Sequence, residues 1–150
     1  MAYVTAHSAG GCLFCEKLLE DADRKNLILC RRTLGFVILN AFPYSTGHVM
    51  IVPNRHVAEL DQLTPDELLS IMTLAQDAIR AITKSYHPDG FNLGMNLGGA
   101  AGAGIDGHLH VHVVPRWSGD TSFMPVVGQV KVIPESLETT FDKLLPHFNP

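Results

Sequence analysis

Short apolar stretches alternate with polar ones along the chain, and several of them have the period of two that is typical of β-strands. The first two are separated only by a tight connection, and the third is rich in β-branched residues and stops at a proline. The pattern predicts strands at 26–31, 34–40, 48–53, 91–97 and 108–114, with a further strand segment at 126–133.

The pattern changes its period after residue 64. Thr64 has the residue type of a helix N-cap, Pro65 suits the first helical position, and Glu67 can complete a capping box. The apolar residues behind them recur every three or four positions, which predicts an amphipathic helix of about five turns that ends near Ser85. We expect its apolar stripe to pack in the core: Leu68, Ile71, Met72, Ala75, Ala78, Ile79 and Ile82.

The order of these elements indicates the fold class. A short helical turn is expected at 16–23 and a closing helix at 135–145, so strands come in runs with one long helix inserted. This order favours an α+β fold with a mainly antiparallel sheet of about five strands, one long helix and a C-terminal helix. Because no repeat, low-complexity stretch or linker composition interrupts the pattern, we expect residues 1–150 to form a single domain.

Composition narrows the possible partners. Apolar residues make up 46% of the chain and charged residues 17%, which is ordinary for a soluble globular protein. No apolar run reaches the ~18 residues of a membrane span, and the first ten residues lack the features of a secretion signal, so we expect a cytoplasmic protein that binds no membrane. A net charge of −4 with scattered basic residues argues against nucleic acid as a partner, although a small anionic ligand is compatible with it.

Histidine is the most informative residue type, because five of the eight histidines fall in two short windows. His108, His110 and His112 alternate with apolar residues in a predicted strand, so their rings would project from one face, each ~6.6 Å from the next. Such a row suits a metal site, or a phosphate site in which a neutral imidazole is the nucleophile and a neighbouring imidazolium neutralises a phosphoryl oxygen. The buried face would carry Leu109, Val111 and Val113.

A glycine-rich stretch leads directly into these histidines. Residues 98–107 contain five glycines and three alanines, and Gly104 lies close to the triad in the sequence. Such a loop lets backbone N–H groups approach and surround an anion. Its position beside three aligned imidazoles favours a phosphate pocket, to which we assign Gly104.

Two runs carry a resemblance to a known family. The run from Gly107 to Arg116 (GHLHVHVVPR) resembles the H-φ-H-φ-H-φ-φ signature of the histidine-triad superfamily, where φ is apolar. The run from Gly47 to Pro53 (GHVMIVP), followed by Arg55 and His56, is similar to the family's second conserved block. The likeness covers about residues 12–120. Segments 94–104 and 115–120 look closest to a bacterial branch that acts on diadenosine polyphosphates.

The resemblance implies roles for single residues. His110, the middle histidine, would be the nucleophile, and His112 would contact the phosphate. His48 and Asn96 match family positions that line the phosphate and nucleoside pocket, and Asn40 matches a residue near the ribose. The family also implies a homodimer whose two sheets join through strand and helix contacts.

The loop before the triad departs from the family pattern. Many relatives carry a Gln or Ser a few residues before the first triad histidine, whereas this chain has Ala103, Gly104 and Ile105, with Asp106 and Gly107 completing the loop. Assistance to the leaving group must then come from elsewhere, such as backbone N–H groups or a cation bound to the substrate, for instance Mg²⁺. The identity of the acceptor is left open by these residues.

The cysteines suggest a second site. Cys12 and Cys15 have the C-x-x-C spacing that supplies half of a tetrahedral zinc site, and His56 and His108 are the best candidates for the other half. Some histidine-triad relatives hold zinc in this arrangement; a reduced pair without metal is the alternative. With four protein ligands the zinc would be structural, and it would fix His108 so that the strand presents His110 in a set direction.

These observations lead to a functional hypothesis. We expect a nucleotidyl hydrolase or transferase that cleaves a nucleoside phosphoanhydride of the diadenosine polyphosphate type at the α-phosphate, through a nucleotidyl-histidine intermediate. A phosphorylase, with phosphate as the acceptor, is the alternative within the same chemistry. A non-catalytic nucleotide-binding or sensing protein and a metal-dependent hydrolase that uses the whole triad as ligands are the alternatives from other classes.

Overall fold

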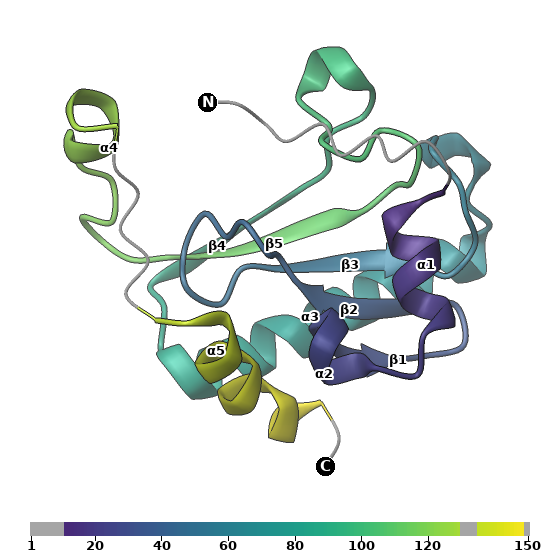
Figure 1. Ribbon diagram of the computed structural model, residues 1–150, viewed down its shortest axis with the longest axis horizontal. Helices are drawn as coiled ribbons and strands as arrows, with labels where there is room; N and C mark the ends of the chain where they lie inside the picture. Colours follow the sequence, from purple (N-terminus) through teal and green to yellow (C-terminus); the bar gives the residue numbers. More distant parts are fainter. Residues whose placement is uncertain (1–10, 130–134, 149–150) are drawn as a thin grey trace.

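The computed structural model describes residues 11–129 and 135–148, and its centre is a five-stranded sheet with the strand order β1-β2-β3-β5-β4 (Figure 1). All neighbouring strands are antiparallel. The predicted α+β class is therefore confirmed, with five strands, one long helix and a C-terminal helix. The strands are β1 (Ile28–Arg31), β2 (Gly35–Leu39), β3 (Val49–Pro53), β4 (Gly90–Gly94) and β5 (Val111–Arg116).

One face of the sheet is covered by the long helix α3 (Pro65–Tyr86), which begins with the predicted capping box. The Thr64 hydroxyl accepts a hydrogen bond from the Glu67 N–H (3.2 Å), and the Glu67 carboxylate accepts one from the Thr64 N–H (2.9 Å). Helix α3 packs on the sheet through Ile71, Leu74, Ala75, Ala78, Ala81 and Ile82.

In the part of the chain that the structure describes, no helix is long and apolar enough to cross a membrane.

The buried face of α3 is rotated from the stripe that the sequence predicted. Leu68 and Met72 remain 40% and 51% exposed, while Leu74 and Ala81, which the stripe omitted, are buried. Apolar surface at the start of α3 is therefore left uncovered. The C-terminal helix α5 (Leu137–Leu144) begins at the N-cap Ser136 and packs against α3.

The opposite face of the sheet carries a smaller apolar cluster and the histidines. Helix α1 (Leu13–Leu19) places Phe14 on this face, where its ring contacts Phe36 and the rings of His108 and His110. The short helix α2 (Asp23–Asn26) then leads into β1. The cluster beside the histidines consists of Phe14, Ile28, Phe36, Ile38, Met50 and Val52.

The histidine segment alternates as expected, although strand β5 starts three residues later than the predicted position 108. The ladder pairs Val49 with Val113 and Ile51 with Val111, and in the same register Pro53 would lie opposite Leu109. Pro53 has no N–H to donate, and the regular pairing ends there. The alternation still continues backwards from β5, because Leu109, Val111 and Val113 are all buried in the core under α3.

Two predicted strands need correction. Strand β4 ends at Gly94 rather than at residue 97, because the chain then turns into the glycine loop, where Gly98 and Gly102 adopt positive φ angles. The strand predicted at 126–133 is wrong for residues 126–129: the first two lie in helix α4 (Met124–Val127), and the next two lie in no strand. Pro125 suits the first turn of a helix, and this preference outweighs the β-branched character of the segment. Residues 130–133 of that prediction lie outside the described residues.

Candidate functional site

The ring of His110 is held in one tautomer by its own backbone neighbourhood. Its Nδ1–H donates to the carbonyl oxygen of His108 at 2.9 Å, so the lone pair of the neutral ring lies on Nε2. The residue is buried beside Phe14, with ring centroids 5.2 Å apart, and this burial lowers the pKa of His110. A neutral imidazole with a free Nε2 has the form of a nitrogen nucleophile.

His112 is oriented by a chain of hydrogen bonds that starts at the backbone. The Tyr44 N–H donates to Nδ1 of His48 (3.0 Å), so the proton of neutral His48 lies on Nε2 and is donated to Nδ1 of His112 (2.9 Å). Burial, aided by His110, lowers the pKa of His112 to about 4. Near pH 7 the neutral ring of His112 therefore carries its proton on Nε2, which makes this atom a hydrogen-bond donor.

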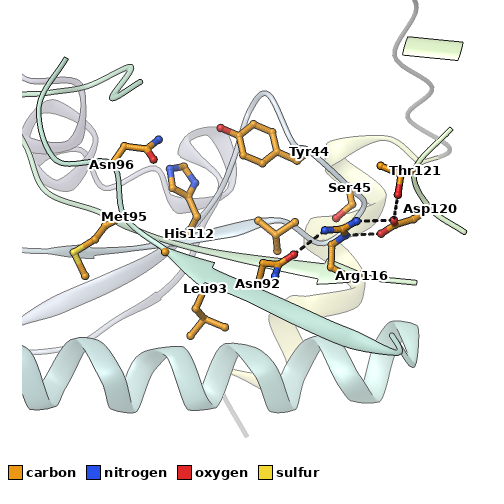
Figure 2. A pocket seen from close by; sticks show the side chains of 12 residues that line it. Tyr44, Ser45, Asn92, Leu93, Met95, Asn96, His112, Arg116, Asp120 and Thr121 are labelled. Atoms are coloured by element: carbon orange, nitrogen blue, oxygen red, sulfur yellow. Dashed lines mark hydrogen bonds and ion pairs between the residues drawn. The ribbon is translucent and has the colours of Figure 1, made fainter. Parts of the chain in front are cut away.

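A cavity of about 500 Å³ opens beside His112 and follows strands β4 and β5 (Figure 2). The Tyr44 ring stands over it, stacked on the His112 ring with centroids 5.9 Å apart and planes at 21°. Asn96 lies close to His112 at one end, and Arg116 with Asp120 marks the other end. The cavity thus leads away from the imidazole row along the open face of the sheet.

The far end of the cavity is a closed polar network. Arg116 donates from Nε and Nη2 to the two carboxylate oxygens of Asp120 (2.6 and 2.7 Å) and from Nη1 to Oδ1 of Asn92 (2.7 Å). The Trp117 N–H also donates to Asp120 (3.1 Å). The guanidinium holds the pKa of Asp120 well below its usual range, so the carboxylate stays charged and neutralises Arg116.

The remaining predicted nucleotide-binding residues occupy different places. Nδ2 of Asn40 lies 3.5 Å from Nε2 of His48, but Asn40 does not line the cavity. Asn96 lines it and donates to the carbonyl of Gly102 (3.4 Å), which ties the glycine loop to the end of β4. Gly104 is exposed within the loop and is not among the residues that line this cavity.

The two cysteines and two histidines singled out as metal ligands meet in space. Their ligand atoms lie within 4.8 Å of one another, with Sγ of Cys12 at 3.2 Å from Nδ1 of His108 and Sγ of Cys15 at 3.5 Å from Nδ1 of His56. The Nε2–H of His108 donates to the carbonyl of Pro53 (2.9 Å), so the lone pair on Nδ1 faces the cysteines. Two thiols and two imidazoles at this spacing fit a tetrahedral zinc ion.

The cluster of two cysteines and two histidines is held in place by residues for which the sequence indicated no role at this site. Arg55, next to His56, donates from Nε and Nη2 to the carboxylate of Glu67 (2.9 and 2.8 Å). This ion pair, together with the Thr64 N–H, lowers the pKa of Glu67 to about 2. The N-terminus of α3 therefore anchors the segment that carries His56.

Other residues of the site were also missed. Tyr44 carries no local signal beyond an exposed aromatic in a loop, and Phe14 is an ordinary apolar residue inside the C-x-x-C motif. Arg116 and Asp120 lie in a stretch that supported the family resemblance, but the spacing alone assigned them no role. Only the folded chain brings Tyr44, Arg116 and Asp120 to one cavity.

The sequence is similar to proteins of a known family. A family model described as the HIT domain matches residues 22–119, and the chain belongs to this family. A Mycobacterium tuberculosis protein named AP-4-A phosphorylase is 47% identical over 119 residues, which cover 79% of this chain and 61% of that protein. A Schizosaccharomyces pombe protein named bis(5'-nucleosyl)-tetraphosphatase (asymmetrical) is 34% identical over 95 residues, or 63% of this chain and 52% of that protein. The chain thus spans about half to three-fifths of the length of these two relatives.

A solved structure has the same fold. The crystal structure of a Zn-bound histidine triad family protein from Mycobacterium smegmatis superposes with a TM-score of 0.75 at 27% identity, over 92% of this chain and 93% of that one. The resemblance inferred from the histidine row is therefore confirmed at the level of family and fold.

Proposed function

We propose that this protein is a nucleotidyl transferase that cleaves a diadenosine polyphosphate at the α-phosphate and passes the nucleotidyl group from His110 to inorganic phosphate. The observation that carries the proposal is the tautomer of His110, whose Nδ1–H donates to the His108 carbonyl and whose Nε2 has no hydrogen-bond partner among the described residues. A protein that binds a nucleotide without cleaving it does not need a nucleophilic nitrogen such as Nε2 of His110. If all three triad histidines bound one metal ion, His108 and His112 would have similar surroundings. Instead His108 faces the cysteines, and His112 is hydrogen-bonded to His48.

In the first step Nε2 of His110 attacks the α-phosphorus, and the bond from phosphorus to the bridging oxygen of the polyphosphate breaks. The leaving polyphosphate takes the electron pair, and a nucleotidyl group remains on Nε2. The ring then carries a positive charge, which the His108 carbonyl stabilises through the Nδ1–H bond. The Nε2–H of His112 donates to a phosphoryl oxygen, where negative charge accumulates in the transition state.

In the second step an oxygen of the acceptor attacks the same phosphorus and the N–P bond breaks, which restores His110. With diadenosine tetraphosphate the first step releases ATP; phosphate as the acceptor then gives ADP, whereas water gives AMP. The relative named AP-4-A phosphorylase, at 47% identity, supports phosphate. The relative named tetraphosphatase, at 34% identity, supports water as the second candidate. The higher identity to the relative named phosphorylase favours phosphate over water as the acceptor.

The other residues act by binding. Asn96 and the glycine loop around Gly104 hold the polyphosphate, His48 sets the tautomer of His112, and Asn40 contacts the ribose on its side of His48. A Mg²⁺ ion would enter with the polyphosphate.

Zinc is proposed as a structural ion. Cys12, Cys15, His56 and His108 would hold it, and it would supply a fixed anchor for the start of the triad. The Zn-bound relative from M. smegmatis supports this assignment. The His108 backbone, which this anchor would fix, is the part of the chain that orients His110.

Product analysis distinguishes the two acceptors. Turnover of diadenosine tetraphosphate with ¹⁸O-labelled inorganic phosphate is expected to give ATP and ADP, with the label in ADP, as measured by mass spectrometry. Omission of phosphate should lower turnover and divert the remaining product to AMP. If AMP forms at the same rate with and without phosphate, the protein is a hydrolase.

We also propose that the protein is a homodimer. Strand β4 lies at the edge of the sheet, and apolar side chains near it and at the start of α3 are uncovered: Leu93 (42% exposed), Leu68 (40%), Leu69 (69%) and Met72 (51%). Sedimentation should give the mass of two chains. A Leu69→Asp variant should sediment as a monomer, whereas Leu19→Asp, at a leucine on α1 that is even more exposed (88%), should stay dimeric.

A further inference from the structure

The ring of His110 has a hydrogen bond that fixes its direction but not its plane. Its Nδ1–H donates to the carbonyl oxygen of His108 at 2.9 Å. A single hydrogen bond at one ring atom still allows the ring to tilt about the line that joins donor and acceptor. In-line attack needs Nε2 to point at the phosphorus, and a misplacement of ~1 Å can cost about 10²-fold in rate. The surroundings of the ring must therefore supply the remaining restraint.

Two neighbouring rings confine the ring of His110. The His112 ring lies with its centroid 4.9 Å away and its plane at 71°. The Phe14 ring lies 5.2 Å from the His110 ring and 5.5 Å from the His108 ring, again between centroids. Among the described residues Phe14 makes no ring contact with His112, so it approaches His110 from the His108 end of the row. The His110 ring is thus held between Phe14 and His112.

The position of Phe14 is itself fixed, because helix α1 is anchored at both ends. Phe14 is the buried residue of this helix and is only 1% exposed. At the start of the helix, the two cysteines of the candidate zinc site flank Phe14 in the sequence. At the end of the helix, the Arg31 guanidinium donates to the carbonyl oxygens of Leu18 (2.6 Å) and Glu20 (2.8 Å). These bonds satisfy carbonyls that a helix C-terminus leaves without partners.

The contact with the imidazoles distinguishes Phe14 from the rest of its apolar cluster. Phe36 is also fully buried in this cluster and its ring contacts that of Phe14, with centroids 6.3 Å apart. In the part of the chain that the structure describes, however, the Phe36 ring meets no histidine ring. A position that only fills the core would accept an aliphatic side chain as well. A flat ring packed against an imidazole also limits the tilt of that imidazole.

We propose that Phe14 is a positioning residue for His110 and that it links the cysteine cluster to the nucleophile. The inference rests on the proposed nucleotidyl transfer and adds a residue that holds the His110 ring at the tilt at which Nε2 faces the α-phosphorus. Because Cys12 and Cys15 flank Phe14, binding of zinc by both thiols would fix the turn of α1 that carries this ring. The nucleophile is thus restrained by a second route, in addition to the His108 backbone.

The test replaces Phe14 by leucine, which keeps an apolar side chain but removes the flat ring. Phe14→Leu should form the nucleotidyl adduct on His110 about 10- to 100-fold more slowly in a single turnover, while KM for diadenosine tetraphosphate stays within about threefold. In NMR spectra the Nδ1–H signal of His110, identified by its absence from His110→Gly, should broaden or disappear. The zinc content should equal that of the wild type.

Phe141→Leu is the matched control. Phe141 is as deeply buried (2% exposed) in the core under α3, and among the described residues its ring contacts no imidazole. The same substitution should lower the melting temperature by a similar few degrees. The adduct rate and the Nδ1–H signal should both stay at their wild-type values. If Phe14→Leu does not fold, Phe14→Met takes its place, because methionine nearly conserves the volume without a rigid ring.

Three results would count against these expectations. An adduct rate in Phe14→Leu equal to that of Phe141→Leu overturns the positioning role. A slower rate that is accompanied by loss of zinc also overturns it, because Phe14 would then only hold the metal cluster together. Absence of both adduct and turnover in the wild type would instead refute the proposed transfer, and the Nδ1–H signal would still show whether Phe14 holds the ring.

Discussion

A His110→Gly variant is expected to lose nucleotidyl transfer almost completely, with kcat reduced by at least about 10³-fold, because no other group can form the N–P bond. The rings of His108 and His112 are committed elsewhere, the first to the Pro53 carbonyl and the cysteine cluster, the second to His48. Steady-state kinetics with diadenosine tetraphosphate measures the loss. Nucleotide affinity, measured by calorimetry, should change little.

His87→Gly serves as the control for removal of an imidazole. His87 is the exposed C-cap of α3 and has a positive φ angle of 48°, which glycine adopts without strain. This variant should be as active and at least as stable as the wild type. Near-normal turnover by His110→Gly would show that His110 is not the nucleophile.

The covalent intermediate gives a direct readout of the same prediction. A rapid alkaline quench of wild-type protein with labelled substrate should trap a nucleotidyl group on His110; the quench must be alkaline because histidine phosphoramidates are labile in acid. Peptide mapping should find no adduct in His110→Gly. An adduct on His112 would shift the roles by one position along the row.

Removal of the zinc site is expected to have the second largest effect. Purified protein should contain about one zinc ion per chain, and Cys12→Ser or Cys15→Ser should release it and lower the free energy of unfolding by several kcal/mol, because a structural zinc ion contributes folding energy directly. The loss should also loosen the His108 backbone, which orients His110. Metal analysis and chemical denaturation provide readouts that are independent of activity.

Cys30→Ala separates the zinc effect from the loss of a cysteine. Cys30 is buried in β1 and lies outside the four-residue cluster. This variant should keep its zinc and lose only the ~1 kcal/mol that is common for a single substitution in a folded protein. A wild type that is stable and fully folded without zinc would contradict the assignment.

The sequence by itself determined the features that follow from local periodicity and residue type. Alternation predicted three of the five strands to within two residues at each end and the other two to within three, and a capping box with a period of three to four predicted α3. The period of two also placed the triad histidines on one face and the apolar residues between them in the core. These signals can be read from the sequence because each one involves only residues that lie close together in a single helix or strand.

The same local signals failed where packing decides between close alternatives. The stripe on α3 included Leu68 and Met72, but the angle at which the helix lies on the sheet leaves them exposed. Val126 and Val127 have the composition of a strand, yet they follow Pro125 in a short helix. Composition cannot report the rotation of a helix or the absence of a partner strand.

The tertiary structure alone decided the chemistry of each imidazole. The carbonyls of Pro53 and His108 and the N–H of Tyr44 fix the three tautomers, and backbone groups of this kind are present at nearly every position, so no residue type marks them in advance. The cavity that reaches Arg116 arises in the same way, because it joins a loop, two strands and the turn after β5. Contacts between such distant segments depend on how the whole chain packs, and a one-dimensional pattern does not contain that information.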